Sequence, residues 1–183
     1  RPDVAAERAA FRERMQKLDP DLLVFVDESG AQTNMVRSHA RSRQGKRARG
    51  TAPCGKHQQL TLLGALSLSG LRAMMTIEAA ADTDVVVAFT EHVLVPTLTP
   101  GQIVVMDNLS PHKAPGVREL IEAAGCRLLL LPPYSPDFSP IEQAWSKLKA
   151  ILRTAAARTT EALEAAIACA SSSPVLVVIS SGS

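Results

Sequence analysis

Several features are scarce or missing in this chain of 183 residues, and each excludes a class of protein. The three cysteines, Cys54, Cys126 and Cys169, are odd in number and form no CxxC pair, which argues against a disulfide framework and a cysteine zinc site. A reducing, intracellular compartment fits this composition. There is no secretory leader pattern, and no apolar run approaches the ~20 residues of a membrane span, so we expect no membrane partner.

Acidic residues are missing from one long interval, between Glu28 and Glu78, although the net charge of the whole chain is only +2. Such a block of one sign is suited to a polyanion, and the alternative is a solvated loop without a partner. The candidate phosphate contacts in this interval are Arg37, Arg41, Arg43, Lys46, Arg47, Arg49 and Lys56.

Short apolar runs alternate with helical patterns along most of the chain. The predicted strands are 22–26, 58–67, 71–77, 103–106 and 126–131, and the predicted helices are 1–18, 84–94, 116–124, one from Pro140 and one from Thr159. The early hairpin predicts antiparallel strands, and the later alternation predicts parallel strands with right-handed crossovers. We therefore expect a mixed α/β sheet with helices on both faces. The expected division is a lead-in helix or linker over 1–20, a catalytic domain over 21–168 and an atypical, poorly ordered tail over 169–183.

The stretch 128–153 combines a short apolar strand, a turn stiffened by four prolines and an amphipathic helix. Ser139 is predicted as the N-cap and Pro140 as the first helical residue, which places Glu142 in the first turn. Glu142 can then either close a capping box with Ser139 or serve as a metal-binding carboxylate. The stretch by itself favours the capping box.

Two further carboxylates follow predicted strands. Asp27 and Glu28 end the strand 22–26, and Asp107 ends the strand 103–106. Side chains alternate along a strand, so Asp27 and Glu28 point to opposite faces, and this pattern does not decide which of them faces a site. In open α/β sheets, sites form at the carboxyl ends of strands.

Three carboxylates gathered at one site repel one another, by roughly 3 kcal/mol for each pair at ~5 Å and an effective dielectric of ~20. Cations offset this repulsion, and oxygen ligands favour Mg²⁺ or Mn²⁺. Two such ions can activate a water or a 3′-hydroxyl and stabilise the leaving oxygen of a phosphodiester.

Three sequence blocks resemble the catalytic blocks of DDE transposases, in the bacterial insertion-sequence branch of the mariner-like superfamily. The blocks are VFVDESG, VVMDNLSPHK and LLPPYSPDFSPIEQAWSKLK, and 34 residues separate Asp107 from Glu142, which is the interval typical of that family. The resemblance implies a ribonuclease H-like domain in which Asp27, Asp107 and Glu142 are the catalytic residues and the ligands of two Mg²⁺ or Mn²⁺ ions. It thereby selects Asp27 over Glu28.

The same resemblance implies partners and further site residues. Double-stranded DNA, as element ends and as target, is the expected substrate, a homodimer is the expected assembly, and the bacterial cytoplasm with its nucleoid is the expected location. Asn108 and His112 lie in the second block and are weaker candidates for DNA contacts; a buried helix-entry histidine is the alternative for His112. We expect Trp145 to be a core residue and Asp137 to be structural.

Two departures from the family pattern leave a second function open. The family has an N-terminal helix-turn-helix region, which we do not expect within this sequence, and the sequence ends in SSSPVLVVISSGS rather than in a segment with aromatic residues. The alternative is an inactive or truncated relic that only binds DNA. A phosphatase with Asp27 as nucleophile is a third possibility, but it leaves the basic interval and the SPDFSPIE block unexplained.

Overall fold

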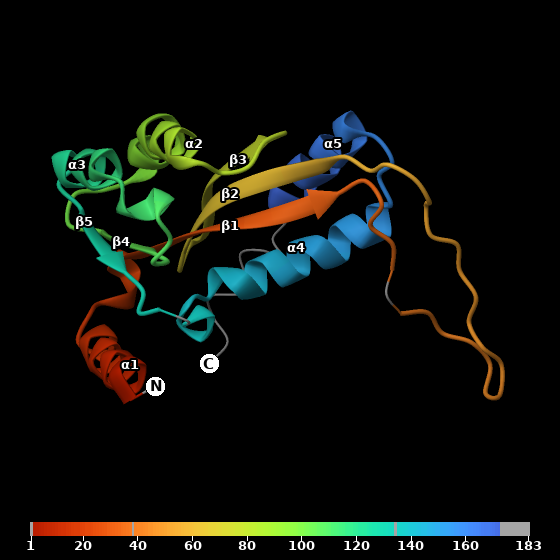
Figure 1. Cartoon of the computed structure of the whole chain (residues 1–183), viewed down its shortest axis with the longest axis horizontal. Coiled ribbons are helices and arrows are strands. Elements are labelled where there is room, and N and C mark those ends of the chain that lie inside the picture. Colours follow the sequence, from red (N-terminus) through yellow and green to blue (C-terminus); the bar gives the residue numbers. More distant parts are fainter. Residues whose placement is uncertain (1, 38, 134, 173–183) are drawn as a thin grey trace.

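A five-stranded mixed sheet forms the centre of the protein in a computed structural model that describes residues 2–37, 39–133 and 135–172 (Figure 1). The strand order is β3-β2-β1-β4-β5, with antiparallel pairing among β1, β2 and β3 and parallel pairing of β1 with β4 and of β4 with β5. This arrangement confirms the predicted mixed sheet. The strands are β1 Leu23–Gln32, β2 Gln59–Ser67, β3 Gly70–Ile77, β4 Ile103–Met106 and β5 Arg127–Leu130.

Helices cover both faces of the sheet, as predicted, and Figure 1 shows α2 and α3 on one side and α4 on the other. Apolar residues of α1, α4 and α5 form one core with the sheet, and those of α2 and α3 form the second. The chain after α2 continues as a π-helical turn, Thr90–Leu94, before β4. The helices are α1 Pro2–Gln16, α2 Thr83–Phe89, α3 Pro115–Ala123, α4 Ile141–Ala155 and α5 Thr160–Ser171.

Strand β1 is longer than the sequence predicted, because it continues past Val26 to Gln32. Its parallel pairing with β4 stops at Phe25 and Val105, whereas its antiparallel pairing with β2 continues to Gln32. The expectation that Asp27 ends a strand is therefore wrong. Asp27 instead lies two residues beyond the last parallel pair, where β4 has ended and only β2 still borders β1.

The two faces of β1 separate its neighbouring carboxylates, as the alternation predicted. Phe25 belongs to the core between the sheet and helices α4 and α5, and Val26 belongs to the core between the sheet and helices α2 and α3. Since side chains two residues apart share a face, Asp27 lies on the α4 side and Glu28 on the α2 and α3 side.

Helix α4 confirms the predicted apolar face but not the predicted cap. Pro140 occupies the N-cap position in helical conformation, and no side chain caps the helix. The N–H of Glu142 is bonded to the backbone oxygen of Ser139 at 3.3 Å, so the Ser139 hydroxyl is not needed there and lines a pocket instead. The apolar face is buried and consists of Ile141, Ala144, Trp145, Leu148 and Leu152.

A long segment without regular secondary structure joins β1 to β2 and extends away from the sheet (Figure 1). We name residues 34–58 the basic arm; its residues 37 and 39–58 are exposed. The base of the arm is fixed, because the N–H of Thr33 donates to the oxygen of Gln58 at 3.0 Å and Arg158 donates to the carbonyl oxygens of Thr33 and Met35 at 3.0 Å each.

Helix α1 is joined to the turn that precedes α4. The guanidinium of Arg8 binds both carboxylate oxygens of Asp137 at 2.9 and 2.7 Å and the hydroxyl of Ser135 at 2.9 Å, and Phe11 stacks on Phe138 at 5.4 Å. The structural role expected for Asp137 is thus confirmed.

At the other end of the chain, α5 continues to Ser171, and the predicted tail lies outside the described residues from 173 onward. None of the helices among the described residues is long and apolar enough to cross a membrane.

Candidate functional site

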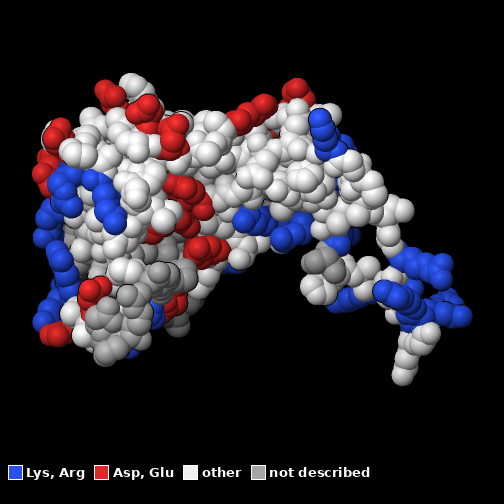
Figure 2. All heavy atoms as spheres, viewed as in Figure 1, with Lys and Arg blue, Asp and Glu red and all other residues white. Residues whose placement is uncertain are grey.

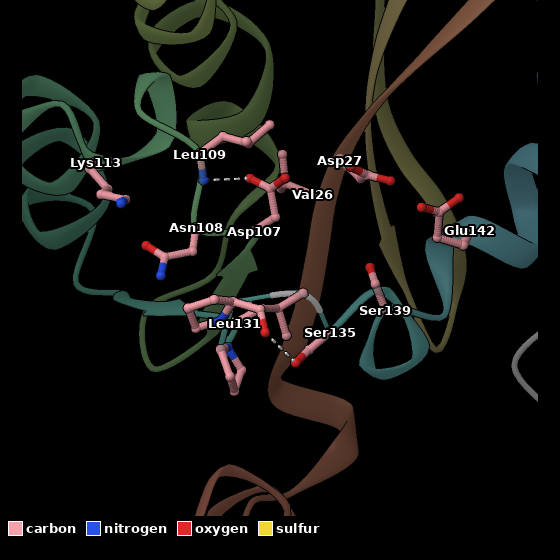
Figure 3. A pocket seen from close by; sticks show the side chains of 12 residues that line it. Val26, Asp27, Asp107, Asn108, Leu109, Lys113, Leu131, Ser135, Ser139 and Glu142 are labelled. Atoms are coloured by element: carbon pink, nitrogen blue, oxygen red, sulfur yellow. Dashed lines mark hydrogen bonds between the residues drawn. The ribbon is translucent and has the colours of Figure 1, made fainter. Parts of the chain in front are cut away.

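A pocket of about 460 Å³ opens beside the end of β4, and the three predicted catalytic carboxylates line it (Figure 3). Asp27 comes from the middle of β1, Asp107 directly follows β4, and Glu142 lies in the first turn of α4. In the sequence, Asp107 comes 80 residues after Asp27, and Glu142 comes 35 residues after Asp107. The sheet order brings them together, because β1 and β4 are neighbours and α4 packs on β1.

Asp27 is held by an aromatic side chain on α4. The indole Nε1 of Trp145 donates a hydrogen bond to Oδ2 of Asp27 at 3.2 Å. Burial raises the pKa of Asp27 to about 6; the backbone N–H of Glu28 acts in the opposite direction, and the negative charges of Glu142 and Asp107 raise it further. The raised pKa thus reflects burial first and the two neighbouring carboxylates second.

Asp107 is held by one of its two oxygens. Oδ1 accepts the N–H of Leu109 at 3.1 Å and lies 2.5 Å from Nδ1 of His112. Burial acts to raise the pKa of Asp107, but the hydrogen bonds from His112 and Leu109 and the nearby positive charges of His112 and Lys113 together outweigh it, and the pKa lies below its usual range. Oδ2 makes no hydrogen bond or ion pair within the described residues and is left for the pocket.

His112 joins Asp107 to the carboxylate that sequence reasoning set aside. Its Nε2 lies 3.1 Å from Oε1 of Glu28, and only 1% of the residue is exposed. Burial acts to lower the pKa of His112, but the hydrogen bond to Asp107 and the ion pair with Glu28 raise it to about 9. The imidazole is therefore cationic at neutral pH and balances two carboxylates.

The position of His112 departs from the DNA contact expected of it. Enclosed between Glu28 and Asp107, the ring offers no surface to a DNA backbone in this structure, which agrees with the alternative of a buried histidine. Sequence reasoning missed Glu28 because the alternation along β1 correctly places it on the face opposite Asp27. The short 3₁₀ turn Pro111–Lys113 returns His112 to that face, and only the fold shows it.

Glu142 is the least constrained of the three carboxylates. Figure 3 shows its carboxylate directed toward Asp27 across the pocket. Its side chain makes no hydrogen bond or ion pair with any residue that the structure describes, so the capping-box alternative is not realised. A free carboxylate in the first helical turn can rotate toward a ligand without losing a bond.

The three carboxylates share a pocket but are not arranged as a finished metal site. Among the described residues, no group of three or more His, Cys, Asp or Glu side chains lies close enough to hold a metal ion. The chemistry of the donor set nevertheless fits a divalent cation, since all three are oxygen donors and the mutual repulsion at Asp27 calls for positive charge.

Other polar side chains line the same pocket. Asn108, predicted as a weak DNA contact, is among them, and so are Lys113 and Ser139 (Figure 3). Lys113 was not singled out from the sequence, although it adjoins His112 in the second block; its ammonium group supplies positive charge at the pocket.

The predicted phosphate contacts on the basic arm do not line this pocket. Arg37, Arg41, Arg43, Lys46, Arg47, Arg49 and Lys56 all lie exposed on the arm. Figure 2 shows a group of Lys and Arg side chains on the projecting arm and a second group along the left side of the main body. The structure thus separates a carboxylate pocket from a basic surface.

A family model identifies the superfamily to which this chain belongs. The family model described as DDE superfamily endonuclease matches residues 22–164, which is more than half of the chain. The chain belongs to the DDE superfamily of endonucleases. The matched region contains Asp27, Asp107 and Glu142, and no curated protein matches the chain in sequence.

Solved structures agree with this DDE endonuclease on the fold. The catalytic domain of Mos1 mariner transposase matches with a TM-score of 0.61 and 13% identity over 97% of this chain and 82% of that one. A Mos1 paired-end complex with left transposon end matches with a TM-score of 0.65 and 16% identity over 94% and 54%, and a mariner Mos1 paired end complex with Mg with 0.60 and 15% over 93% and 63%.

These matches confirm the predicted ribonuclease H-like fold. The DDE endonuclease chain spans about half the length of the Mos1 chain in the paired-end complex.

Proposed function

We propose that this DDE endonuclease is the catalytic part of a transposase of the bacterial insertion-sequence branch, with residues 21–168 as the catalytic domain. It hydrolyses the phosphodiester bond at the ends of its element and then joins the freed 3′-hydroxyl to target DNA. The proposal rests on the observation that Asp27, Asp107 and Glu142 all line the same pocket.

The proposed cofactor is Mg²⁺ or Mn²⁺, with two ions held by Asp27, Asp107 and Glu142. When bound, such ions supply a more acidic attacking hydroxyl and stabilise the leaving oxygen. Leu109 and His112 hold Oδ1 of Asp107, and its Oδ2 remains for a metal ion. Trp145 holds Oδ2 of Asp27, and its Oδ1 remains for a metal ion. Lys113 and Asn108 border the position of a scissile phosphate, where they can bind its oxygens.

The basic arm is proposed to bind the DNA backbone. Its seven Lys and Arg side chains are exposed and no acidic residue lies within it, so phosphate contacts release counterions without competition from nearby carboxylates. A pocket of about 460 Å³ can by itself contact only a short length of DNA. The basic arm extends the proposed contact along the DNA backbone. Two element ends have to be brought together in one reaction, so we propose that the protein acts as a homodimer. Its proposed location is the bacterial cytoplasm, at the nucleoid.

A nicking assay tests the proposal. The purified chain is incubated with Mg²⁺ and a supercoiled plasmid carrying the inverted repeats that flank its gene. We expect cleavage that requires Mg²⁺ and is lost in Asp107→Asn, whereas Asp84→Asn, an exposed carboxylate at the start of α2, serves as the matched control and cleaves normally. Equal cleavage by the Asp107 variant refutes the assignment.

The alternative of a relic that only binds DNA makes a different prediction in the same assay. It predicts salt-sensitive retention of the plasmid with no nicking at any concentration of Mg²⁺ or Mn²⁺. Binding without nicking would therefore favour the relic.

A further inference from the structure

The indole of Trp145 has a contact that core packing does not require. Trp145 is the single tryptophan of the chain, and it is 3% exposed within the core formed with α4 and α5. Its Nε1 donates to Oδ2 of Asp27 at 3.2 Å. A buried indole N–H needs an acceptor, and here the acceptor is one of the three pocket carboxylates.

Gly64 makes this contact sterically possible. It is the Cα partner of Asp27 across β1 and β2, so the two residues share a face of the sheet. A Cβ atom placed on Gly64 would lie 2.5 Å from Cη2 and 3.0 Å from Cζ2 of Trp145, which are ring atoms that cannot bend aside. A glycine within a strand often marks such a close approach.

We propose that Trp145 is a positioning residue for Asp27, and that Gly64 provides the space in which it acts. The indole fixes one carboxylate oxygen of Asp27 without cancelling its charge, and the other oxygen stays available to a divalent cation. The inference rests on the proposed function, in which Asp27 is a metal ligand. Donors that orient a metal ligand in this way commonly govern metal affinity.

Packing and positioning predict different results for conservative substitutions. If Trp145 only filled space, Trp145→Phe would lower stability and leave Mg²⁺ affinity unchanged. If it positions Asp27, Trp145→Phe weakens Mg²⁺ binding as well, because the phenyl ring fills most of the volume but has no N–H. Leu152→Val is the matched control, since Leu152 is buried in the same core two turns further along α4.

The contact itself has a direct spectroscopic test. A chain with one tryptophan gives one indole signal in a ¹H–¹⁵N correlation spectrum. We expect this signal to move in Asp27→Ala and to move in the wild type when Mg²⁺ is added to saturation. A signal that responds to neither change overturns the proposal.

Calorimetric titration with MgCl₂ completes the test. We expect Trp145→Phe and Gly64→Ala each to weaken Mg²⁺ binding on the order of 10-fold, and Leu152→Val to leave it unchanged. Wild-type affinity in the folded Trp145→Phe variant refutes the positioning role and leaves the proposed function intact. A wild-type chain that binds no Mg²⁺ refutes the proposed function, and the positioning role with it.

Discussion

Replacing Asp27 by asparagine should stabilise the metal-free protein at neutral pH. Burial and the nearby carboxylates raise the pKa of Asp27 from 3.8 to about 6, so the folded state disfavours its charged form. A shift of that size corresponds to roughly 3 kcal/mol as an upper bound, and because the pocket is open to water we expect about 1–3 kcal/mol. Asparagine keeps an oxygen that accepts the Trp145 N–H and carries no charge.

The sign of the effect fixes its pH dependence. A pKa that is higher in the folded state favours folding of the protonated carboxyl, and this contribution is fully present below 3.8 and is lost as the pH rises through about 6. The advantage of Asp27→Asn over the wild type is therefore largest above pH 6 and disappears near pH 4.

Urea unfolding in EDTA at pH 7.5 and pH 4 measures this difference. Asp84→Asn is the control, and its stability relative to the wild type should not depend on pH in this way. An Asp27→Asn protein that is less stable than the wild type at pH 7.5, or whose advantage persists unchanged at pH 4, contradicts the electrostatic account.

Three further predictions follow from the same geometry. Saturating Mg²⁺ should raise the melting temperature of the wild type but not of Asp27→Asn, because the neutral amide is a poor ligand; equal increases would oppose the assignment. Glu28→Ala should cost about 1–3 kcal/mol at pH 7, since it leaves the buried His112 with one partner, while Glu28→Gln should cost less. Wild-type stability of both variants in urea unfolding would show that the ion pair contributes little. Replacing Arg47 and Arg49 together by alanine should reduce the slope of log affinity for DNA against log salt by about 2. Arg127→Ala, on the main body, should leave that slope unchanged.

The sheet was predictable because its strands are compact apolar runs separated by proline, glycine and polar residues. Ile103–Met106 was predicted with its observed bounds, and the turn predicted at Ser69-Gly70 lies one residue from the observed turn at Leu68 and Ser69, because Gly70 already belongs to β3. The extension of β1 was not predictable, because residues 27–32 are held by pairing with β2 rather than by their own hydrophobic pattern.

The pocket was predictable in its carboxylates but not in the residues that hold them. Asp27, Asp107 and Glu142 follow from the three blocks, whereas strand alternation alone left Asp27 and Glu28 undecided. The contacts of His112 with Glu28 and of Trp145 with Asp27 join residues that are far apart in the chain or on different faces of a strand. Such contacts depend on how a short turn and a helix pack on the sheet, which local sequence does not encode.

We propose that three carboxylates from three separate elements, Asp27, Asp107 and Glu142, bind divalent cations together. Calorimetric titration of the folded chain with MnCl₂ measures this binding, with Asp27→Asn, Asp107→Asn and Glu142→Gln alongside the wild type. We expect saturable binding by the wild type and a loss of at least about 10-fold in affinity for each variant. Equal binding by all four proteins, or none by the wild type, would contradict it.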